Sequence, residues 1–374
     1  MTDLVAAAVL PCDPCVRRAW LVAALAGHLE RAWRARRPLR DVLALDDHTL
    51  IVSLGGERAP QLTEELARLD LDAVRAAWTV GRVVAVCRHD PRYPARLRTG
   101  ADAPAIVFCA GDVDLLERGL GGTVEDGPPA VAVVGTRRPL PEAEELARSL
   151  GRGLASAGVC VVSGMAMGVD AAAHQGALAV GGPTVAVLAC APDVAYPRSV
   201  AAVHRALVAT QLVISELPPG TTPWRWAFPA RNRIIAALGR ATVVVEAAER
   251  SGSLITADFA ADLGRDIGAV PGRAASPRTR GSNRLLAQGA AVIVEAADVL
   301  DLVLGPAARG ATPAIPARLE PRLQVLLAAV LDGENPAAHA RTPEAADAVR
   351  VGLLELELLG LVRRVAGGGH VVTG

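Results

Sequence analysis

The segment of this chain best suited to chemistry is a strip of arginines and aromatic residues from Trp224 to Arg233. It reads Trp-Arg-Trp-Ala-Phe-Pro-Ala-Arg-Asn-Arg, and it places three of the chain's ten aromatic residues within five positions. Flat rings stack on nucleobases, at about 1–3 kcal/mol per base, and guanidinium groups donate forked hydrogen bonds to phosphate oxygens. The strip therefore predicts a site for single-stranded nucleic acid.

The strip also suggests which of its side chains are exposed. Three exposed rings would be costly, so we expect one or two of them to fill the edge of the core. Phe228 is framed by arginines and is our choice for the exposed ring. Arg231 and Arg233 are expected to contact phosphates, with Asn232 between them.

Three short turns of small residues could hold the phosphates themselves. Each follows a predicted strand and opens a predicted helix: Gly135-Thr136-Arg137, Ser163-Gly164 and Ser251-Gly252-Ser253. Glycine lets a ligand approach the backbone, and a helix N-terminus favours an anion. The turns lack the GxGxxG spacing of dinucleotide sites, so we expect no cofactor.

The turns belong to a regular alternation of strands and helices. Apolar strands are predicted at 131–134, 159–163, 184–188, 212–215, 242–246 and 267–270, separated by helices at 141–156, 169–178, 200–208, 231–238 and 254–263. Such alternation is typical of an α/β fold with a parallel sheet covered on both faces. The carboxyl ends of parallel strands share one edge, so we expect the three turns to meet there.

The rest of the chain divides into smaller parts. We predict a helical N-terminal domain at 1–78, with helices at 16–37 and 60–78, an extended Rossmann-like domain at 79–304 and a linker at 305–317. Residues 318–374 read as a winged-helix-like domain, with two helices and a glycine-tipped hairpin. Its second helix carries Glu355 and Glu357, which favours a protein contact or a structural role over binding in a DNA groove.

Composition limits the compartment and the partners. The formal net charge is zero and all 39 basic residues are arginine, so a nucleic-acid site must be local. From Arg225 to Arg284, ten arginines face five acidic residues. No apolar run is long enough to span a bilayer, so no membrane partner is expected.

The six cysteines are scattered, which suits a reduced, cytoplasmic protein. Cys12-x-x-Cys15 stands alone, without a second pair in ligand spacing, so we expect no metal.

An enzyme is the main alternative. Asp170 and His174 lie on one face of a predicted helix, yet no nucleophilic Ser or Cys accompanies them, and we expect a hydrogen-bonded structural pair. Glu246 and Asp258 do not form a paired acid and base. A Rossmann-like nucleotide hydrolase of the phosphoribohydrolase kind, or a nucleotide sensor, remains an alternative to a binding protein without catalysis.

Ordered motifs over about 80–302 carry a family resemblance. They are Tyr93-Pro94, Val134-Gly135-Thr136-Arg137, Ser163-Gly164 through Asp170, Ala173-His174, Tyr196-Pro197, Ser215-Glu216, Pro218-Pro219-Gly220, Phe228-Pro229 with Arg231-Asn232-Arg233-Ile234-Ile235, Ser251 through Ala257, and Pro271-Gly272. In these the chain resembles the DNA-processing A (DprA/Smf) proteins of bacteria. Met167 stands where that family commonly has an arginine.

The resemblance implies an extended Rossmann-like domain without catalytic activity. It implies a protein that binds and protects incoming single-stranded DNA, forms a homodimer and loads RecA recombinase during natural transformation. Family DNA contacts carry over onto Arg137, Arg225, Phe228, Arg231 and Arg233. Family dimer contacts carry over onto the helix near Leu285 and Leu286.

Overall fold

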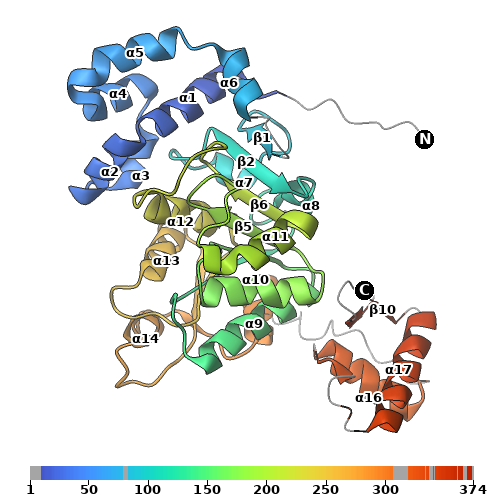
Figure 1. Ribbon diagram of the computed structural model, residues 1–374. Coiled ribbons are helices and arrows are strands. Elements are labelled where there is room, and N and C mark those ends of the chain that lie inside the picture. Colours follow the sequence, from blue (N-terminus) through green and yellow to red (C-terminus); the bar gives the residue numbers. More distant parts are fainter. Residues whose placement is uncertain are drawn as a thin grey trace, which may run out of the picture.

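A nine-stranded sheet with helices on both faces forms the centre of the molecule (Figure 1). The computed structural model describes residues 10–78, 83–305, 319–332, 334–336, 340, 342–359, 361–364 and 369–372. No helix among these residues is both long and apolar enough to cross a membrane.

The sheet order is β1-β2-β6-β5-β4-β3-β7-β8-β9. The strands are β1 (Val83–Cys87), β2 (Ile106–Gly111), β3 (Ala130–Val134), β4 (Cys160–Ser163), β5 (Thr184–Leu188), β6 (Leu212–Ser215), β7 (Ala241–Val244), β8 (Asp266–Ala269) and β9 (Ala291–Val292). Strands β3 to β9 pair in parallel, and β1 and β2 extend the sheet antiparallel from β6. The α/β fold with a mostly parallel sheet is thus confirmed.

Strand β3 lies at the point where the order of the sheet reverses. The chain proceeds from β3 through β4, β5 and β6 on one side, and then through β7, β8 and β9 on the other. Connections that leave β3 and β7 in opposite directions open a crevice at the carboxyl ends of the strands, where ligands bind in such sheets.

Helices cover both faces of the sheet. They are α7 (Ala95–Arg98), α8 (Leu115–Leu120), α9 (Pro141–Ser156), α10 (Val169–Ala179), α11 (Ala201–Thr210), α12 (Ala227–Leu238), α13 (Gly252–Asp262), α14 (Arg280–Ala287) and α15 (Ala296–Leu304). Alternate residues of β3 supply the two cores: Ala132 and Val134 pack with α12, and Val131 and Val133 pack with α9. This two-sided burial is why the strands read as continuous apolar runs.

Two glycines let α9 and α10 approach closely. A Cβ on Gly151 would lie 2.0 Å from the carbonyl oxygen of Ala173, and one on Gly176 would lie 1.9 Å from that of Arg148. Real side chains do not fit at such distances, so the two backbones meet only because both positions lack a side chain.

The N-terminal residues form six short helices where the sequence predicted two long ones. These are α1 (Asp13–Ala24), α2 (Ala26–Arg34), α3 (Leu39–Ala44), α4 (Asp47–Gly55), α5 (Ala59–Ala67) and α6 (Leu71–Trp78). The chain turns at Leu25 and Pro38, and Asp46 caps α4 by accepting the Thr49 N–H. The helices therefore end at local caps and at Pro38, although the helical spacing of apolar residues continues past these points.

These helices pack on the sheet domain rather than standing apart. Leu25 and Leu29 join one apolar cluster with Trp226 and Ala230 of the segment that begins α12. A second cluster joins α1 and Trp78 to β1 and β2, where the Trp78 and Phe108 rings meet edge to face at 5.0 Å. The N-terminal helices are thereby held beside the carboxyl ends of the strands.

The C-terminal residues have a core of their own. Helices α16 (Pro321–Leu331) and α17 (Pro343–Leu358) pack together with the antiparallel pair β10 (Val362–Arg364) and β11 (His370–Val372). The predicted linker lies, apart from residue 305, outside the described residues. The winged-helix assignment and the domain boundaries stay predictions.

We expect Gly151→Ala to lower the free energy of unfolding by about 1–3 kcal/mol, because the added methyl group would force α9 away from α10. Urea denaturation measures this loss. Gly27→Ala is the matched control, since the added methyl on α2 would meet only one ring atom of Trp224 at 4.0 Å. Equal effects of the two substitutions would contradict the close approach of the helices.

Candidate nucleic-acid interface

A groove of ≈ 570 Å³ runs over the carboxyl ends of β3, β4 and β7. Its lining includes Trp33, Gly135, Thr136, Arg137, Asp170, Tyr196, Arg225, Phe228, Arg231, Asn232, Ser251, Gly252 and Ser253. A smaller cavity of ≈ 90 Å³, which Gly164 and Met167 help to line, shares Arg137, Tyr196, Phe228 and Arg231 with the groove. The structure therefore gathers eleven of the thirteen predicted binding residues at one edge of the sheet.

The turn after β3 and the start of α13 face the groove with little side-chain cover. At Gly135 a Cβ would come within 2.7 Å of Val169, so only glycine fits between β3 and α10. Ser251 caps α13 by accepting the Ser253 N–H, and Gly252 is exposed with no atom near an added Cβ. The positive end of the α13 dipole is thus open to an anion.

Arg231 forms the floor of the groove. It is only 6 % exposed, and Nη1 donates to the Gly164 carbonyl at 2.7 Å and to the carbonyl of Val187. Burial lowers the pKa of Arg231 to about 10, although Asp170 nearby favours the charged form. Gly164 is required here, because a Cβ would lie 2.1 Å from the same Nη1. The role of Gly164 is therefore to seat Arg231.

The turn between β4 and α10 is strained and is held by Asp170. Met165 has a φ of 53° and Gly168 a φ of 78°, and left-handed backbone is uncommon for methionine. The Asp170 carboxylate accepts the N–H groups of Gly164 at 3.2 Å and Ala166 at 3.3 Å, on either side of Met165. Burial raises the pKa of Asp170 against the opposing effect of Arg231.

Three side chains form a layered wall above Arg231. The Arg137 guanidinium lies 5.4 Å from the centre of the Phe228 ring, and the Tyr196 ring lies 5.8 Å from it at 50°. Arg137 and Tyr196 are exposed, and Phe228 is half-buried. Rings and a guanidinium in contact offer stacking surface beside positive charge.

The three aromatic residues of the strip differ in burial, and only one of them lines the groove. Trp226 is fully buried in the cluster beneath the N-terminal helices, and Trp224 is half-buried against the same cluster. Phe228 is the ring that reaches the groove. Its role in binding stays a prediction.

Two aromatic residues of the groove, Tyr196 and Trp33, were missed by the sequence reasoning. Tyr196 was noticed only as part of a Tyr-Pro motif, although an aromatic residue in a loop after a predicted strand is itself a signal. Trp33 comes from α2, about two hundred residues before the strip, and no local pattern links it to the groove.

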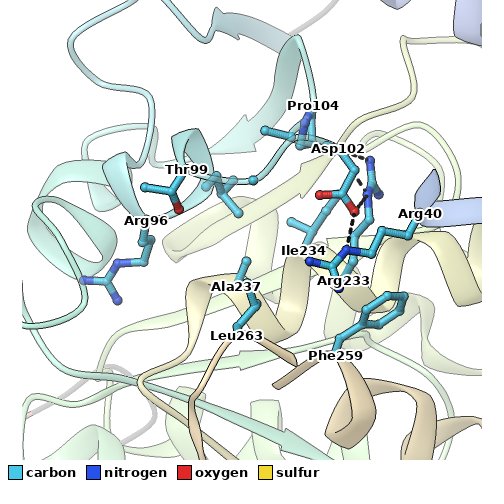
Figure 2. Close-up of a pocket in the computed structure, with 13 residues that line it drawn as sticks. Arg40, Arg96, Thr99, Asp102, Pro104, Arg233, Ile234, Ala237, Phe259 and Leu263 are labelled. Carbon is cyan, nitrogen blue, oxygen red and sulfur yellow. Dashed lines mark hydrogen bonds and ion pairs between the residues drawn. The ribbon is translucent and has the colours of Figure 1, made fainter. Parts of the chain in front are cut away.

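The side chains of two predicted binding residues, Ser163 and Arg233, do not reach the groove. The Ser163 side chain is fully buried and donates to the Val133 carbonyl at 2.6 Å. Arg233 lies on the opposite side of α12 from the groove, since a helix turns through about 200° over two residues. Its guanidinium forms ion pairs with Glu216 at 2.7 Å and Asp102 at 3.4 Å. Figure 2 shows Asp102 between Arg233 and Arg40.

Asp170 and His174 do not form the expected hydrogen-bonded pair. His174 is fully buried, and its Nδ1 lies 2.8 Å from the Thr184 hydroxyl. Burial lowers the pKa of His174 to about 3, so the ring is neutral at physiological pH. Both residues have structural partners. Asp170 accepts backbone N–H groups of the turn before α10, and His174 links α10 to Thr184 of β5.

The turn at Gly272, which follows β8, is closed by a side chain of α14. Asn283 accepts the Gly272 N–H and donates to the Gly272 carbonyl, both at 3.0 Å. Neither residue lines the groove. Leu285 and Leu286 lie half-buried on α14, with Leu285 against the main core, and the dimer contact stays a prediction.

The statement that Cys12 and Cys15 stand alone is also wrong. Cys87 and His89 lie beside them, so a second pair in ligand spacing does exist. The signal was Cys87-x-His89 at the end of a predicted strand, which the search for a second CxxC overlooked.

The charges of the groove suit a polyanion better than a hydrolytic reaction. Three arginines and one aspartate belong to its lining, and within the described part of the chain no second carboxylate joins Asp170 there. General acid–base hydrolysis commonly uses two titratable groups placed on either side of the bond that breaks. The groove offers rings, guanidinium groups and backbone N–H groups.

A sequence profile of the DNA recombination-mediator protein A family matches residues 84–304, more than half of the chain. The chain belongs to this family. Protein Smf of Synechocystis is 36% identical over 315 residues, which cover 74% of this chain and 77% of that protein.

Two solved structures resemble the fold. DNA processing protein A (DprA) of Streptococcus pneumoniae has a TM-score of 0.61 at 31% identity, covering 76% of this chain and 95% of that one. DNA processing protein A of Helicobacter pylori has a TM-score of 0.52 at 29% identity, covering 60% and 97%, and its structure describes a single-stranded DNA binding mode.

We expect Arg233→Ala to lower the free energy of unfolding by about 3–5 kcal/mol, because it leaves the Glu216 carboxylate buried without its partner. Urea denaturation measures the loss, and Arg205→Ala, an exposed position on α11 outside the groove, is the control. A variant that kept its stability but bound oligonucleotide weakly would place Arg233 at the interface after all.

Proposed function

We propose that this protein binds single-stranded DNA in the groove over the carboxyl ends of β3, β4 and β7. The observation that carries the proposal is the wall of Arg137, Phe228 and Tyr196 above the buried guanidinium of Arg231. The wall combines a stacking surface with fixed positive charge, and such surfaces bind unpaired strands.

In this proposal the backbone and the bases of the strand have separate partners. Phosphates lie over Gly135 and the N-terminus of α13, and Arg137 and Arg225 contact them from the exposed side. Bases stack on Phe228 or Tyr196. A duplex keeps its bases stacked on each other and cannot use these rings, so the site prefers single strands.

Family membership and the Helicobacter pylori relative support the same reading. The finer proposal is that the protein protects incoming single-stranded DNA and loads RecA recombinase onto it during natural transformation or DNA recombination. It acts as a homodimer through the surface of α14 near Leu285 and Leu286, and it has no catalytic role.

Arg137→Ala combined with Phe228→Ala should strongly weaken oligo(dT) binding. The ring contributes about 1–3 kcal/mol of stacking, and each lost phosphate contact reduces the slope of log affinity against log salt by about 0.7. Fluorescence anisotropy across a salt series, with a duplex of equal length for comparison, measures both terms.

Arg205→Ala, exposed on α11 and outside the groove, is the control for the loss of one positive charge. Unchanged oligo(dT) binding in the double variant would reject the groove. Release of free base from nucleoside monophosphates would favour the hydrolase, and tight mononucleotide binding without oligonucleotide binding would favour the sensor.

Leu286→Glu should reduce self-association and RecA loading while leaving oligo(dT) affinity nearly unchanged, because α14 lies outside the groove lining. Analytical ultracentrifugation and RecA filament formation on DNA covered by single-strand-binding protein report the two effects. A wild-type protein that stays monomeric at micromolar concentration would rule out the dimer.

A further inference from the structure

Four metal-binding side chains meet where the N-terminal helices join the sheet. The sulfur atoms of Cys12, Cys15 and Cys87 and a ring nitrogen of His89 all lie within 4.8 Å of one another. The Nδ1 atom of His89 is 3.2 Å from the Cys12 sulfur and 3.4 Å from the Cys15 sulfur. The two pairs are more than seventy residues apart in the sequence, so the fold creates the cluster.

Backbone geometry holds each pair in place. Cys12 is the N-cap of α1 and Cys15 lies in its first turn, where the Val16 N–H donates to the Cys12 carbonyl at 3.0 Å. The turn brings both sulfurs to one side of the start of α1.

Cys87 ends β1, and a turn closed by the Asp90 N–H to the Cys87 carbonyl, at 2.8 Å, carries His89 back beside it. Arg92 fixes Asp90 through a 2.7 Å ion pair. The second pair is therefore held as firmly as the first.

The donor set points to one ion. Three thiolates and one imidazole are soft and borderline ligands, and a Cys₃His set is a recurrent structural zinc site. Zinc bonds of about 2.3 Å to sulfur and about 2.0–2.1 Å to nitrogen place tetrahedral ligand atoms roughly 3.5–3.8 Å apart. The distances in the cluster bracket these values, so small side-chain rotations suffice.

We propose that Cys12, Cys15, Cys87 and His89 bind one zinc ion that fastens the N-terminal helices to β1. With four protein ligands the coordination is complete, which marks a structural site rather than a catalytic one. Cys15 and Cys87 are buried in the apolar cluster that joins α1 to β1 and β2, and Cys12 lies at its margin. The ion sits over the seam between the two units.

The zinc link between α1 and β1 also bears on the groove, because the helix after α1 carries a groove residue. Helix α2 continues from α1 and supplies Trp33 to the groove wall. Strand β1 is the outermost strand of the sheet and pairs only with β2. A cross-link from α1 to this edge strand holds the helices that complete the wall.

A disulfide is the competing use of these cysteines. One disulfide would leave the third thiol unpaired and would give His89 no partner of its own. The approach of one imidazole nitrogen to two sulfurs is the arrangement of ligands around a common centre. All six cysteines of the structure have free thiols.

The test is the metal content of the purified full-length chain, measured by inductively coupled plasma mass spectrometry, and its visible spectrum after exchange into Co²⁺. We expect one zinc ion per chain and the intense thiolate-to-cobalt absorption of a tetrahedral sulfur-rich site. Cys12→Ser with Cys15→Ser should lose both signals. Cys190→Ser, a buried cysteine outside the cluster, should keep them.

His89→Ala guards against a variant that simply fails to fold, because His89 is exposed and outside the apolar core. It should fold, weaken zinc binding and lose the tetrahedral cobalt spectrum. Removal of zinc by a chelator should speed amide exchange in α1 and β1 but leave β3 unchanged.

Three results would overturn the proposal. They are a reduced wild-type protein that binds neither zinc nor cobalt, a disulfide among Cys12, Cys15 and Cys87 in mass spectra, or full zinc content in the Cys12→Ser, Cys15→Ser variant. Unchanged amide exchange after zinc removal would reject the fastening role. None of these readouts depends on DNA binding, so the test stands apart from the proposed function.

Discussion

The groove depends on one buried cation. Arg231 reaches from α12 across the ends of two neighbouring strands and donates to the carbonyls of Gly164 and Val187, which lie at the ends of β4 and β5. A guanidinium in this position ties α12, which also carries Phe228, to the sheet edge. It adds positive charge from below while its own hydrogen bonds keep it from moving outward.

The strained turn after β4 lies beside the same contact. Gly164 must lack a side chain to admit Arg231, and the chain then passes through a left-handed residue at Met165 before α10 begins. The Asp170 carboxylate offsets part of that strain by accepting two backbone N–H groups of the turn. It also lies near Arg231 and balances part of its positive charge. Strained backbone of this kind collects at functional sites, where the surrounding structure holds it.

Much of this arrangement could be predicted from the sequence, because strand ends in a parallel sheet share an edge. Gly135, Gly252 and Phe228 follow from their place after strands and beside arginines. Arg231 and Arg233 could not be told apart by composition, and the helical period separates them only once the face of α12 is known. The place of Trp33 in the groove depends on a contact between distant segments, which local patterns do not contain. Cys87-x-His89 is a local pattern, but its approach to Cys12 and Cys15 depends on the fold.

Because Trp33 lines the groove, both the N-terminal helices and the sheet domain contribute to its wall. The glycine turns and the Arg231 floor belong to the sheet, whereas one side of the opening is a tryptophan carried on α2. Substitutions within the first helices can thus change this side of the groove without disturbing the backbone turn at Gly135 or the start of α13. Under the proposed function, changes in either the N-terminal helices or the sheet domain would alter the affinity of the groove for DNA.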